Sequence, residues 1–476
     1  MHDVIIVGGG VTGTSIAREL SRYSLSIALL EKEEELAFGV SKSNSGIIHP
    51  GTQNGVNSLK GRLCLLGNAL TRGMSKELGI DFKETGELIV AFNEQERLKL
   101  LQLKKEAEAL GVPRLSMVDR RWLSSHEPNL SKDVIAALYA PTAGIISPYR
   151  WVYDLSENAS ANGVEIRTNT KVERIEVRGA RDFSVLTDKG PFGAKFVINA
   201  AGLFADDVSR MVGVNDFTIM PRKGEEFLLD KKKENIANHL IFPLPSKESK
   251  GVLVIKTSDG NPMIGPTAVD VTDKNDLSTS DEGFRKVLAS VQKLIPSING
   301  NDVIAYFAGL RPVSGDDFII RHENRVPGFI NVAGIQSPGL TSAPAIALMV
   351  AGLLKDNGLV MRRKIFFRKH RKKETHLFNI PLKETKKLIK KDPAYGDIVC
   401  RCELVSSKEV TDAISRGATT MDGIKFRTRA QAGRCHGSFC TTRLIRILAE
   451  KTGKRPEEIT KRGKASPIVK GGRHDG

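Results

Sequence analysis

Four of the five cysteines lie near the C-terminal end of the chain, and their spacing suits metal binding. They form the pairs Cys400-x-Cys402 and Cys435-x-x-x-x-Cys440, and 32 residues separate the two pairs. Four thiolates suit either a zinc ion or a [2Fe–2S] cluster. A zinc ribbon more often has two residues between the cysteines of each pair, so the first pair departs from that pattern. Spacing alone leaves both metals as candidates. The fifth cysteine, Cys64, lies between two leucines and is expected in the core.

A glycine-rich loop near the N-terminus is the second feature that could do chemistry. The apolar residues 3–7 lead into Gly8-x-Gly10-x-x-Gly13, which opens a segment of helical spacing. Gly8 permits a tight turn, Gly10 lets the backbone approach a pyrophosphate, and Gly13 lets the helix pack closely on the strand. Glu31 ends the next apolar strand, eighteen residues after Gly13, where its carboxylate suits an adenosine ribose. The sequence therefore predicts a dinucleotide site, without choosing between FAD and NAD.

Further segments resemble the D-amino-acid-oxidase-type flavoproteins. These segments are residues 43–51, 197–202, 259–267, 309–312 and 334–341. Within that superfamily the chain resembles the branch of FAD-dependent glycerol-3-phosphate dehydrogenases/oxidases and L-2-hydroxyglutarate dehydrogenases, in order through residues 1–355. The resemblance implies bound FAD and oxidation of a small anionic alcohol. The substrate that we expect is sn-glycerol 3-phosphate, which would give dihydroxyacetone phosphate, and L-2-hydroxyglutarate is the alternative.

The implied reaction needs a proton acceptor and an anion site. Hydride transfer from an alcohol also requires removal of the hydroxyl proton, and histidine titrates near neutral pH. His49 lies in an irregular segment before Pro50, and in the family this histidine lies beside the flavin ring, so we expect it to be the base. Arg311 offers a planar fork for phosphate or carboxylate, and its family position faces the substrate. Lys250 aligns with a lysine that looks substrate-facing in the glycerol-phosphate branch.

The resemblance also implies a set of cofactor contacts. Backbone amides at the start of a helix near residue 340 would stabilise negative charge on the reduced flavin. The expected cofactor-binding residues are Gly8, Gly10, Thr12, Gly13, Glu31, Lys32, Ser43, Asn44, Ser45, Gly46, Val172, Ala201, Gly202, Gly334, Ser337, Gly339, Leu340 and Thr341.

The cysteine segments resemble a second family. Residues 400–403 and 427–440 resemble the bacterioferritin-associated-ferredoxin-like (BFD-like) [2Fe–2S] domain, which is fused to some anaerobic-type glycerol-3-phosphate dehydrogenases. That family usually has Gly-Met-Gly before the third cysteine and Gln after it, whereas this chain has Gln431-Ala432-Gly433 and His436. The resemblance implies a [2Fe–2S] cluster, with zinc as the alternative, on the ligands Cys400, Cys402, Cys435 and Cys440.

The two resemblances imply an α/β architecture that brings these residues together. We expect a Rossmann-like FAD-binding domain, an antiparallel-sheet substrate domain of α+β type, and a small, mainly helical C-terminal iron–sulfur domain. The FAD-binding parts are expected at about 1–80, 145–215 and 300–355, and the substrate-binding parts at about 81–144 and 216–299. A basic linker is expected at 356–395 and the BFD-like domain at 396–476. Strands are expected at 3–7, 26–30, 164–166, 172–177, 196–199 and 329–333, and helices at 14–23, 95–110, 283–295 and 343–354.

The net charge of +17 belongs to the C-terminal part of the chain. Residues 355–476 carry 31 Lys or Arg and 13 Asp or Glu, whereas the residues before them are almost neutral. Such a surface suits an electron-transfer partner, for example an NAD(P)H/FAD oxidoreductase, or the anionic face of a membrane. Nucleic acid is less favoured because few aromatic residues interleave with the cations. The N-terminus lacks the pattern of a secretory signal, so we expect a cytoplasmic protein with peripheral contact at the inner face of the membrane.

Two other functions remain open. An amine or amino-acid oxidase would need no base for a hydroxyl proton, which would leave His49 without a role. A metal- or nucleic-acid-binding factor built on an inactive flavin fold would fit the basic tail, but not the intact catalytic residues. Flavin absorbance in the purified protein separates this last alternative from the enzymes.

Overall fold

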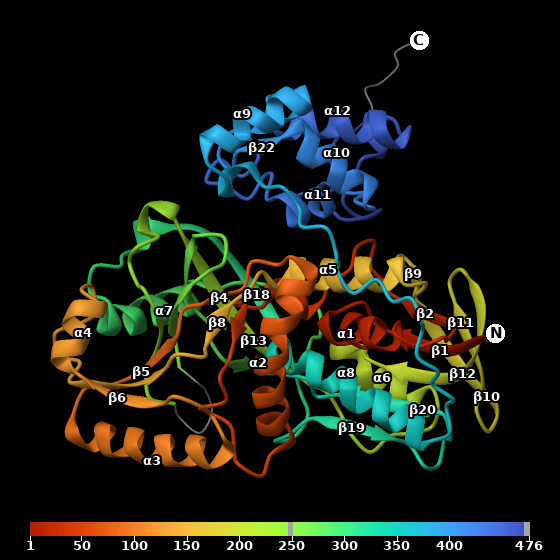
Figure 1. The fold of residues 1–476 in the computed structure, drawn as a ribbon, viewed down its shortest axis with the longest axis horizontal. Helices are drawn as coiled ribbons and strands as arrows, with labels where there is room; N and C mark the ends of the chain where they lie inside the picture. The colour runs from red at the N-terminus through yellow and green to blue at the C-terminus, as the bar shows by residue number, and fades with distance from the viewer. Residues whose placement is uncertain (246–250, 471–476) are drawn as a thin grey trace. The chain divides into compact units, whose positions relative to one another are not determined.

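The computed structural model describes residues 1–245 and 251–470, which form two compact units (Figure 1). The first unit comprises Met1–Leu30, Ala37–Ile166 and Val172–Arg371. The second comprises Glu31–Leu36, Arg167–Lys171 and Lys372–Gly476. The basic residues 356–371, expected to belong to a linker, therefore group with the first unit.

An eight-stranded sheet carries the glycine loop (Figure 1). β1 lies between β2 and β12, all three are parallel, and β20 extends the parallel set beyond β12. The residues of β2 and β20 are buried throughout, as the strands of a sheet covered on both faces should be. β10 pairs with β11 at one edge of the sheet, and β9 lies beside β2 at the other edge. The strands are β1 (His2–Val7), β2 (Ile27–Leu30), β9 (Glu165–Arg167), β10 (Val172–Gly179), β11 (Asp182–Thr187), β12 (Gly190–Asn199), β19 (Ile319–His322) and β20 (Phe329–Ala333).

The helices around this sheet pack closely on one another. α8 packs against both α1 and α2, and α1 also packs against α5. α8 has 18 residues and is long and apolar enough to cross a membrane, but 67% of it is buried inside the structure, as in the core helix of a globular fold. The expected helix at 343–354 is therefore the central part of α8. The helices are α1 (Val11–Leu20), α2 (Leu59–Leu78), α5 (Pro148–Ala161), α6 (Ala205–Arg210) and α8 (Gly339–Asp356).

A nine-stranded, mainly antiparallel sheet forms the expected substrate part. Three helices accompany it, and α7 packs against β13, β15 and β16. The strands are β5 (Glu87–Ala91), β6 (Ser116–Asp119), β7 (Ala136–Ala140), β13 (Met220–Leu229), β14 (Leu240–Phe242), β15 (Leu253–Lys256), β16 (Pro262–Gly265), β17 (Val269–Asp270) and β18 (Val303–Val313). The helices are α3 (Glu94–Leu110), α4 (Arg120–His126) and α7 (Asp281–Leu294). A small sheet joins β3 (Ile47–Ile48), β4 (Lys83–Glu84) and β8 (Gly144–Ile145).

One strand corrects the expected division of the chain. The sequence assigned residues 300–355 to the FAD-binding part, but β18 pairs with β13 along its length, from Val303 to Val313. Continuous pairing of this kind makes β18 part of the nine-stranded sheet. Arg311 therefore lies on the substrate sheet rather than on the FAD-binding one.

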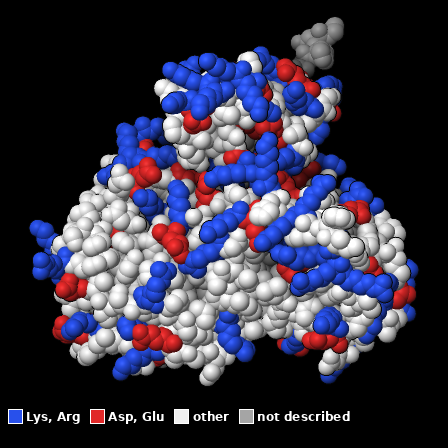
Figure 2. Space-filling view, in the orientation of Figure 1, with Lys and Arg blue, Asp and Glu red and all other residues white. Residues whose placement is uncertain are grey.

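The second unit has its own apolar core, formed chiefly by residues of α10, α11 and α12. A capping box begins α10, because Ser406 Oγ accepts from the Glu409 amide and the Glu409 carboxylate accepts from the Ser406 amide. Part of the expected linker is ordered here, since Leu377 is buried and a helix follows it. Figure 2 shows Lys and Arg side chains across the face turned to the viewer. The elements are α9 (Leu382–Lys391), β21 (Ile398–Cys400), β22 (Val405–Ser406), α10 (Ser407–Ser415), α11 (Met421–Thr428) and α12 (Thr441–Thr452).

Candidate functional site

The carboxyl ends of the parallel strands meet at one edge of the eight-stranded sheet. Val7 of β1 lies opposite Asn199 of β12 and Leu30 of β2, and Asn199 lies opposite Asn331 of β20. The glycine loop, Ala201–Gly202 and Gly334 follow these strands, so they gather at the same edge. In an open parallel sheet this edge is where ligands bind.

Close backbone packing explains the glycines of the loop. Gly8 has φ +112°, and a Cβ built there would lie 2.4 Å from the Ala200 carbonyl oxygen. A Cβ on Gly13 would lie 2.0 Å from the Gly8 carbonyl oxygen, so only glycine fits either position. Gly10 is the N-cap of α1 and provides no side-chain cap. The Val11 amide donates to Ser41 Oγ at 2.9 Å, which leaves the next amide of the first turn, that of Thr12, for an anionic group. The loop therefore has the backbone shape that a dinucleotide pyrophosphate requires.

The His49 loop is tied to the start of α8. The His49 amide donates to Thr341 Oγ1 at 2.9 Å, and the His49 carbonyl accepts from Asn68 Nδ2 at 2.9 Å. The His49 ring lies 6.1 Å, centroid to centroid, from the ring of Phe242 on β14. Main-chain bonds thus fix the loop while the imidazole faces the substrate sheet. The expected residues Gly339, Leu340 and Thr341 begin α8, and Ser337 precedes its N-cap, Pro338.

The predicted loop 43–46 meets the substrate sheet. Gly46 has φ +78° and its amide donates to Asn44 Oδ1 at 2.8 Å, which shapes the turn that also contains Ser45. A Cβ on Gly309 of β18 would lie 2.7 Å from Ser43 Oγ, so this face of β18 packs directly on the loop.

Arg311 lies on that same face of the sheet. The antiparallel register places Arg311 opposite Arg222, Gly309 opposite Gly224, and Phe307 opposite Glu226, and opposed residues share a face. Arg311 Nη2 donates to the Thr267 carbonyl at 2.6 Å, which orients the guanidinium. Within the described residues its Nη1 donates no hydrogen bond, so this nitrogen is available to an anionic ligand.

Glu226 is a site residue that the sequence analysis missed. It is only 5% exposed, and within the described part of the chain its Oε2 has no hydrogen-bond partner. Burial raises the pKa of Glu226 to about 8, although the charge of Arg311 pulls the pKa down. The neighbouring Glu225 faces the other side of the sheet, where its carboxylate accepts from Ser280. Two consecutive carboxylates in a strand must face opposite sides, and this pattern is the signal that could have found Glu226.

Three of the remaining predicted cofactor contacts, Glu31, Lys32 and Val172, lie in the described part of the chain. Glu31 and Lys32 follow β2 and belong to the second unit, where Glu31 Oε1 accepts from the Glu33 amide at 2.9 Å. Val172 begins β10 and packs on the core beneath the eight-stranded sheet. Lys250 lies outside the described residues.

The four C-terminal cysteines come together in the second unit. Cys400 hydrogen bonds with Cys440, and Cys402 with Cys435. Cys400 and Cys440 are buried, Cys402 is exposed and Cys435 is intermediate. The hydrogen bond from Cys440 lowers the pKa of the Cys400 thiol to about 6, because it stabilises the thiolate.

Backbone amides surround these sulfurs. The Gln431 and Glu403 amides bond Cys400, and the Gly437 and Phe439 amides bond Cys435. Cys440 is the N-cap of α12, so the helix N-terminus adds positive potential. These donors fit an anionic cluster with thiolate ligands.

The class of protein follows from comparison of this chain with known families. Residues 3–353 match the family described as FAD dependent oxidoreductase, and the chain belongs to this family. Residues 398–450 match the BFD-like [2Fe-2S] binding domain. The expected flavoprotein fold and the two cofactors, FAD and a [2Fe–2S] cluster, are thereby confirmed, whereas the individual residues assigned to them stay predictions.

The relatives with similar sequences are oxidoreductases named for two substrates. A glycerol 3-phosphate dehydrogenase from Caloramator mitchellensis is 42% identical, over 99% of this chain and 98% of its own length. An L-2-hydroxyglutarate dehydrogenase from Escherichia coli K12 is 30% identical over 72% of this chain and 90% of its own length. The solved structure of a dithionite-reduced L-alpha-glycerophosphate oxidase from Mycoplasma pneumoniae, with FAD bound, has a TM-score of 0.74 and 33% identity over 78% of this chain and 98% of that one.

Replacing Glu226 by Gln is expected to change how thermal stability depends on pH. The folded-state pKa of about 8 exceeds the ordinary 4.5, so Glu226 favours the folded state fully only below about pH 4.5. That stabilisation is lost as the pH rises toward about 8, at about 1.4 kcal/mol per pH unit. The melting temperature of the variant should therefore rise relative to the unaltered protein between about pH 5 and about pH 8, and the difference should be constant above that range.

The control for this prediction is Glu94→Gln, because that side chain is 70% exposed. Its melting temperature should follow the unaltered protein at every pH. A Glu226→Gln difference that does not vary with pH would contradict the raised pKa.

Proposed function

We propose that this chain oxidises sn-glycerol 3-phosphate to dihydroxyacetone phosphate and passes the electrons to an acceptor or partner. The observation that carries this proposal is the 42% identity to a glycerol 3-phosphate dehydrogenase, over 99% of this chain and 98% of that one. The arrangement of His49 and Arg311 around one face of the substrate sheet supports it. Bound FAD would supply the hydride acceptor, and the [2Fe–2S] cluster would carry electrons singly.

In this proposal His49 is the base. An imidazole nitrogen accepts the proton of the substrate C2 hydroxyl, and the main-chain bonds of His49 to Thr341 and Asn68 hold the loop in place. The buried ring of Phe242 lies edge-on to the imidazole and gives it an apolar neighbour. The His49 imidazole is thus positioned to accept the hydroxyl proton of the substrate.

Arg311 binds the phosphate in this proposal. Its Nη2 is held by the Thr267 carbonyl, so the guanidinium can present Nη1 to a phosphate oxygen. An ionised carboxylate nearby would compete for Arg311. With a pKa of about 8, Glu226 is mainly protonated at neutral pH, which leaves the Arg311 charge for the substrate.

L-2-hydroxyglutarate is the second candidate substrate, because the Escherichia coli enzyme named for it is 30% identical to this chain. Steady-state dye reduction with each substrate separates the two. We expect kcat/KM to be at least about a hundredfold higher for glycerol 3-phosphate. A preference for hydroxyglutarate would overturn the choice.

We further propose that the four cysteines hold the cluster and that electrons leave the protein through it. Replacing Cys435 by Ala should remove bound iron and the cluster's visible absorption, while flavin reduction by substrate keeps its rate. Turnover with a one-electron protein acceptor should fall by at least about tenfold, because the exit route is lost. The measurements are iron content, the visible spectrum and both rates.

Cys64→Ala is the matched control for the cysteine variant. This thiol is buried in the first unit and donates to the His49 carbonyl at 3.6 Å, whereas the four clustered cysteines belong to the second unit. The control should keep its iron. Full iron content in the Cys435→Ala protein would contradict the assignment of Cys435 as a ligand. Zinc instead of iron in the unaltered protein would contradict the proposed [2Fe–2S] cluster.

A further inference from the structure

Two large apolar side chains stand almost fully exposed on the first unit. Ile365 is 92% exposed and Phe366 is 91% exposed, and Val360 on the same segment is 71% exposed. Single exposed apolar residues are common on protein surfaces, but an adjacent pair at this exposure is unusual. We call Ile365 and Phe366 the apolar tip.

The chain on both sides of the apolar tip is anchored. Before it, the Lys364 amide donates to the Arg22 carbonyl at 2.9 Å. After it, the Arg368 amide donates to Asn162 Oδ1 at 2.8 Å, and the Arg22 guanidinium lies 4.7 Å from the centroid of the Phe367 ring. Because both flanks are held by these bonds, the backbone of the apolar tip is already fixed. Binding a partner would therefore cost little conformational entropy in this segment.

Cations flank the apolar tip on each side. Arg362, Arg363 and Arg368 are all exposed and lie within three residues of it. Lys369 is also near, but it pairs with Glu77 at 3.1 Å. An apolar projection with exposed cations around it suits a surface that is apolar below a layer of negative charge.

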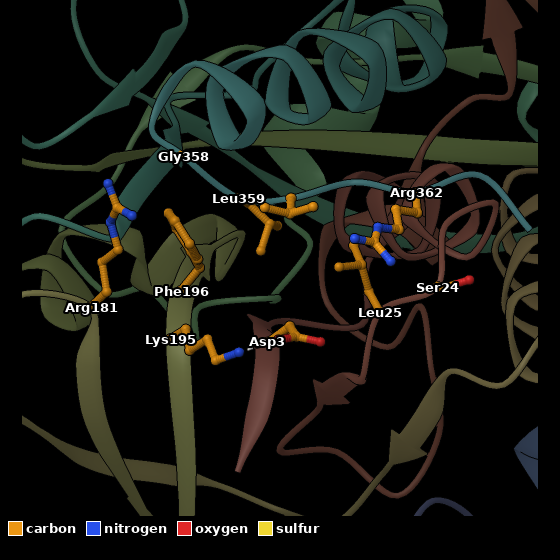
Figure 3. Close-up of a pocket in the computed structure, with 10 residues that line it drawn as sticks. Asp3, Ser24, Leu25, Arg181, Lys195, Phe196, Gly358, Leu359 and Arg362 are labelled. Atoms are coloured by element: carbon orange, nitrogen blue, oxygen red, sulfur yellow. Dashed lines mark hydrogen bonds and ion pairs between the residues drawn. The ribbon is translucent and has the colours of Figure 1, made fainter.

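A basic pocket adjoins the same segment (Figure 3). Its volume is about 340 Å³, and Val360 and Arg362 form part of its wall. Figure 3 shows Arg181 and Arg362 on opposite sides of this pocket, with Lys195 between them. Lys195 is paired with Asp3 at 2.8 Å, so the two arginines carry the net positive charge. The two arginines give the pocket the charge that suits the phosphate of a headgroup.

We propose that residues 360–368 dock this protein on an anionic phospholipid bilayer, with the apolar tip inserted among the lipids and the arginines on the headgroup phosphates. The apolar tip offers roughly 350 Å² of surface, far below what a stable protein interface buries. A second copy of this chain would bring like charges together, since the net charge is +17. A lipid surface is the partner that fits both the small apolar area and the positive charge.

Flotation of the purified holoenzyme with lipid vesicles tests this proposal. The protein should float with vesicles that contain phosphatidylglycerol and bind pure phosphatidylcholine vesicles at least about tenfold more weakly. The double variant Ile365→Ser, Phe366→Ser should bind the anionic vesicles at least about tenfold more weakly than the unaltered protein. The triple variant Arg362→Gln, Arg363→Gln, Arg368→Gln should lose about fivefold for each charge removed.

The matched control carries Leu98→Ser and Leu101→Ser, which change two exposed leucines of α3 (64% and 37% exposed). It should bind like the unaltered protein. Flavin absorbance and melting temperature show that each variant is folded. Equal binding of neutral and anionic vesicles, undiminished binding by the double serine variant, or self-association abolished by that variant would each overturn the proposal.

Discussion

Replacing His49 by Ala is expected to slow reduction of the bound flavin by glycerol 3-phosphate by about 100- to 10,000-fold. The imidazole is the proposed acceptor of the hydroxyl proton, whereas the loop itself is held by main-chain bonds to Thr341 and Asn68. The substitution should therefore leave the loop and the FAD content unchanged. Rapid mixing under anaerobic conditions, followed at the flavin absorbance, measures the rate.

The control for this prediction is His370→Ala, because His370 is an exposed histidine in the basic segment. It should reduce flavin at the rate of the unaltered protein. A His49→Ala enzyme within about threefold of that rate would show that the proton goes elsewhere.

Replacing Arg311 by Ala is expected to lower kcat/KM for glycerol 3-phosphate by about 30- to 1,000-fold, mostly through KM. The guanidinium is the proposed partner of the substrate phosphate, and its loss would leave that anion without a charged donor. Arg311→Lys should recover only part of the loss, because an ammonium keeps the charge but lacks the planar fork. Steady-state kinetics over a range of substrate concentrations measure both constants.

Arg222→Ala is the control for the Arg311 variants. Arg222 lies opposite Arg311 in the strand register, but its Nε donates to the exposed Asp270 at 2.6 Å. Its charge is already compensated, so kcat/KM should change by less than about threefold. Equal losses in the two variants would mean that the whole positive patch, rather than Arg311, attracts the substrate.

Local sequence patterns identified the glycine loop and the start of one helix. The glycine spacing identified Gly8 and Gly13, whose backbones approach others too closely for any side chain. The pattern Ser406-x-x-Glu409 marks the start of α10 in the sequence itself, because both bonds of this capping box join residues only three apart. Such features depend on neighbours in the chain, so the sequence contains the whole signal.

Features that depend on long-range pairing were harder to predict. β18 was assigned to the wrong part because its partner β13 lies about eighty residues earlier and nothing local records that pairing. The pairing also brings Arg311 near Glu226, and no sequence pattern gives the resulting pKa. The basic segment 356–371 was expected to be a linker because charge suggests exposure, yet its backbone bonds to Arg22 and Asn162 attach it to the first unit.

The most direct test of the proposed function is anaerobic mixing of the oxidised holoenzyme with glycerol 3-phosphate and, separately, with L-2-hydroxyglutarate. We predict that glycerol 3-phosphate bleaches the flavin absorbance rapidly and completely, at a rate that His49→Ala lowers by at least about a hundredfold. L-2-hydroxyglutarate should bleach it far more slowly. Flavin that stays oxidised with glycerol 3-phosphate, or that hydroxyglutarate reduces faster, would contradict the proposal.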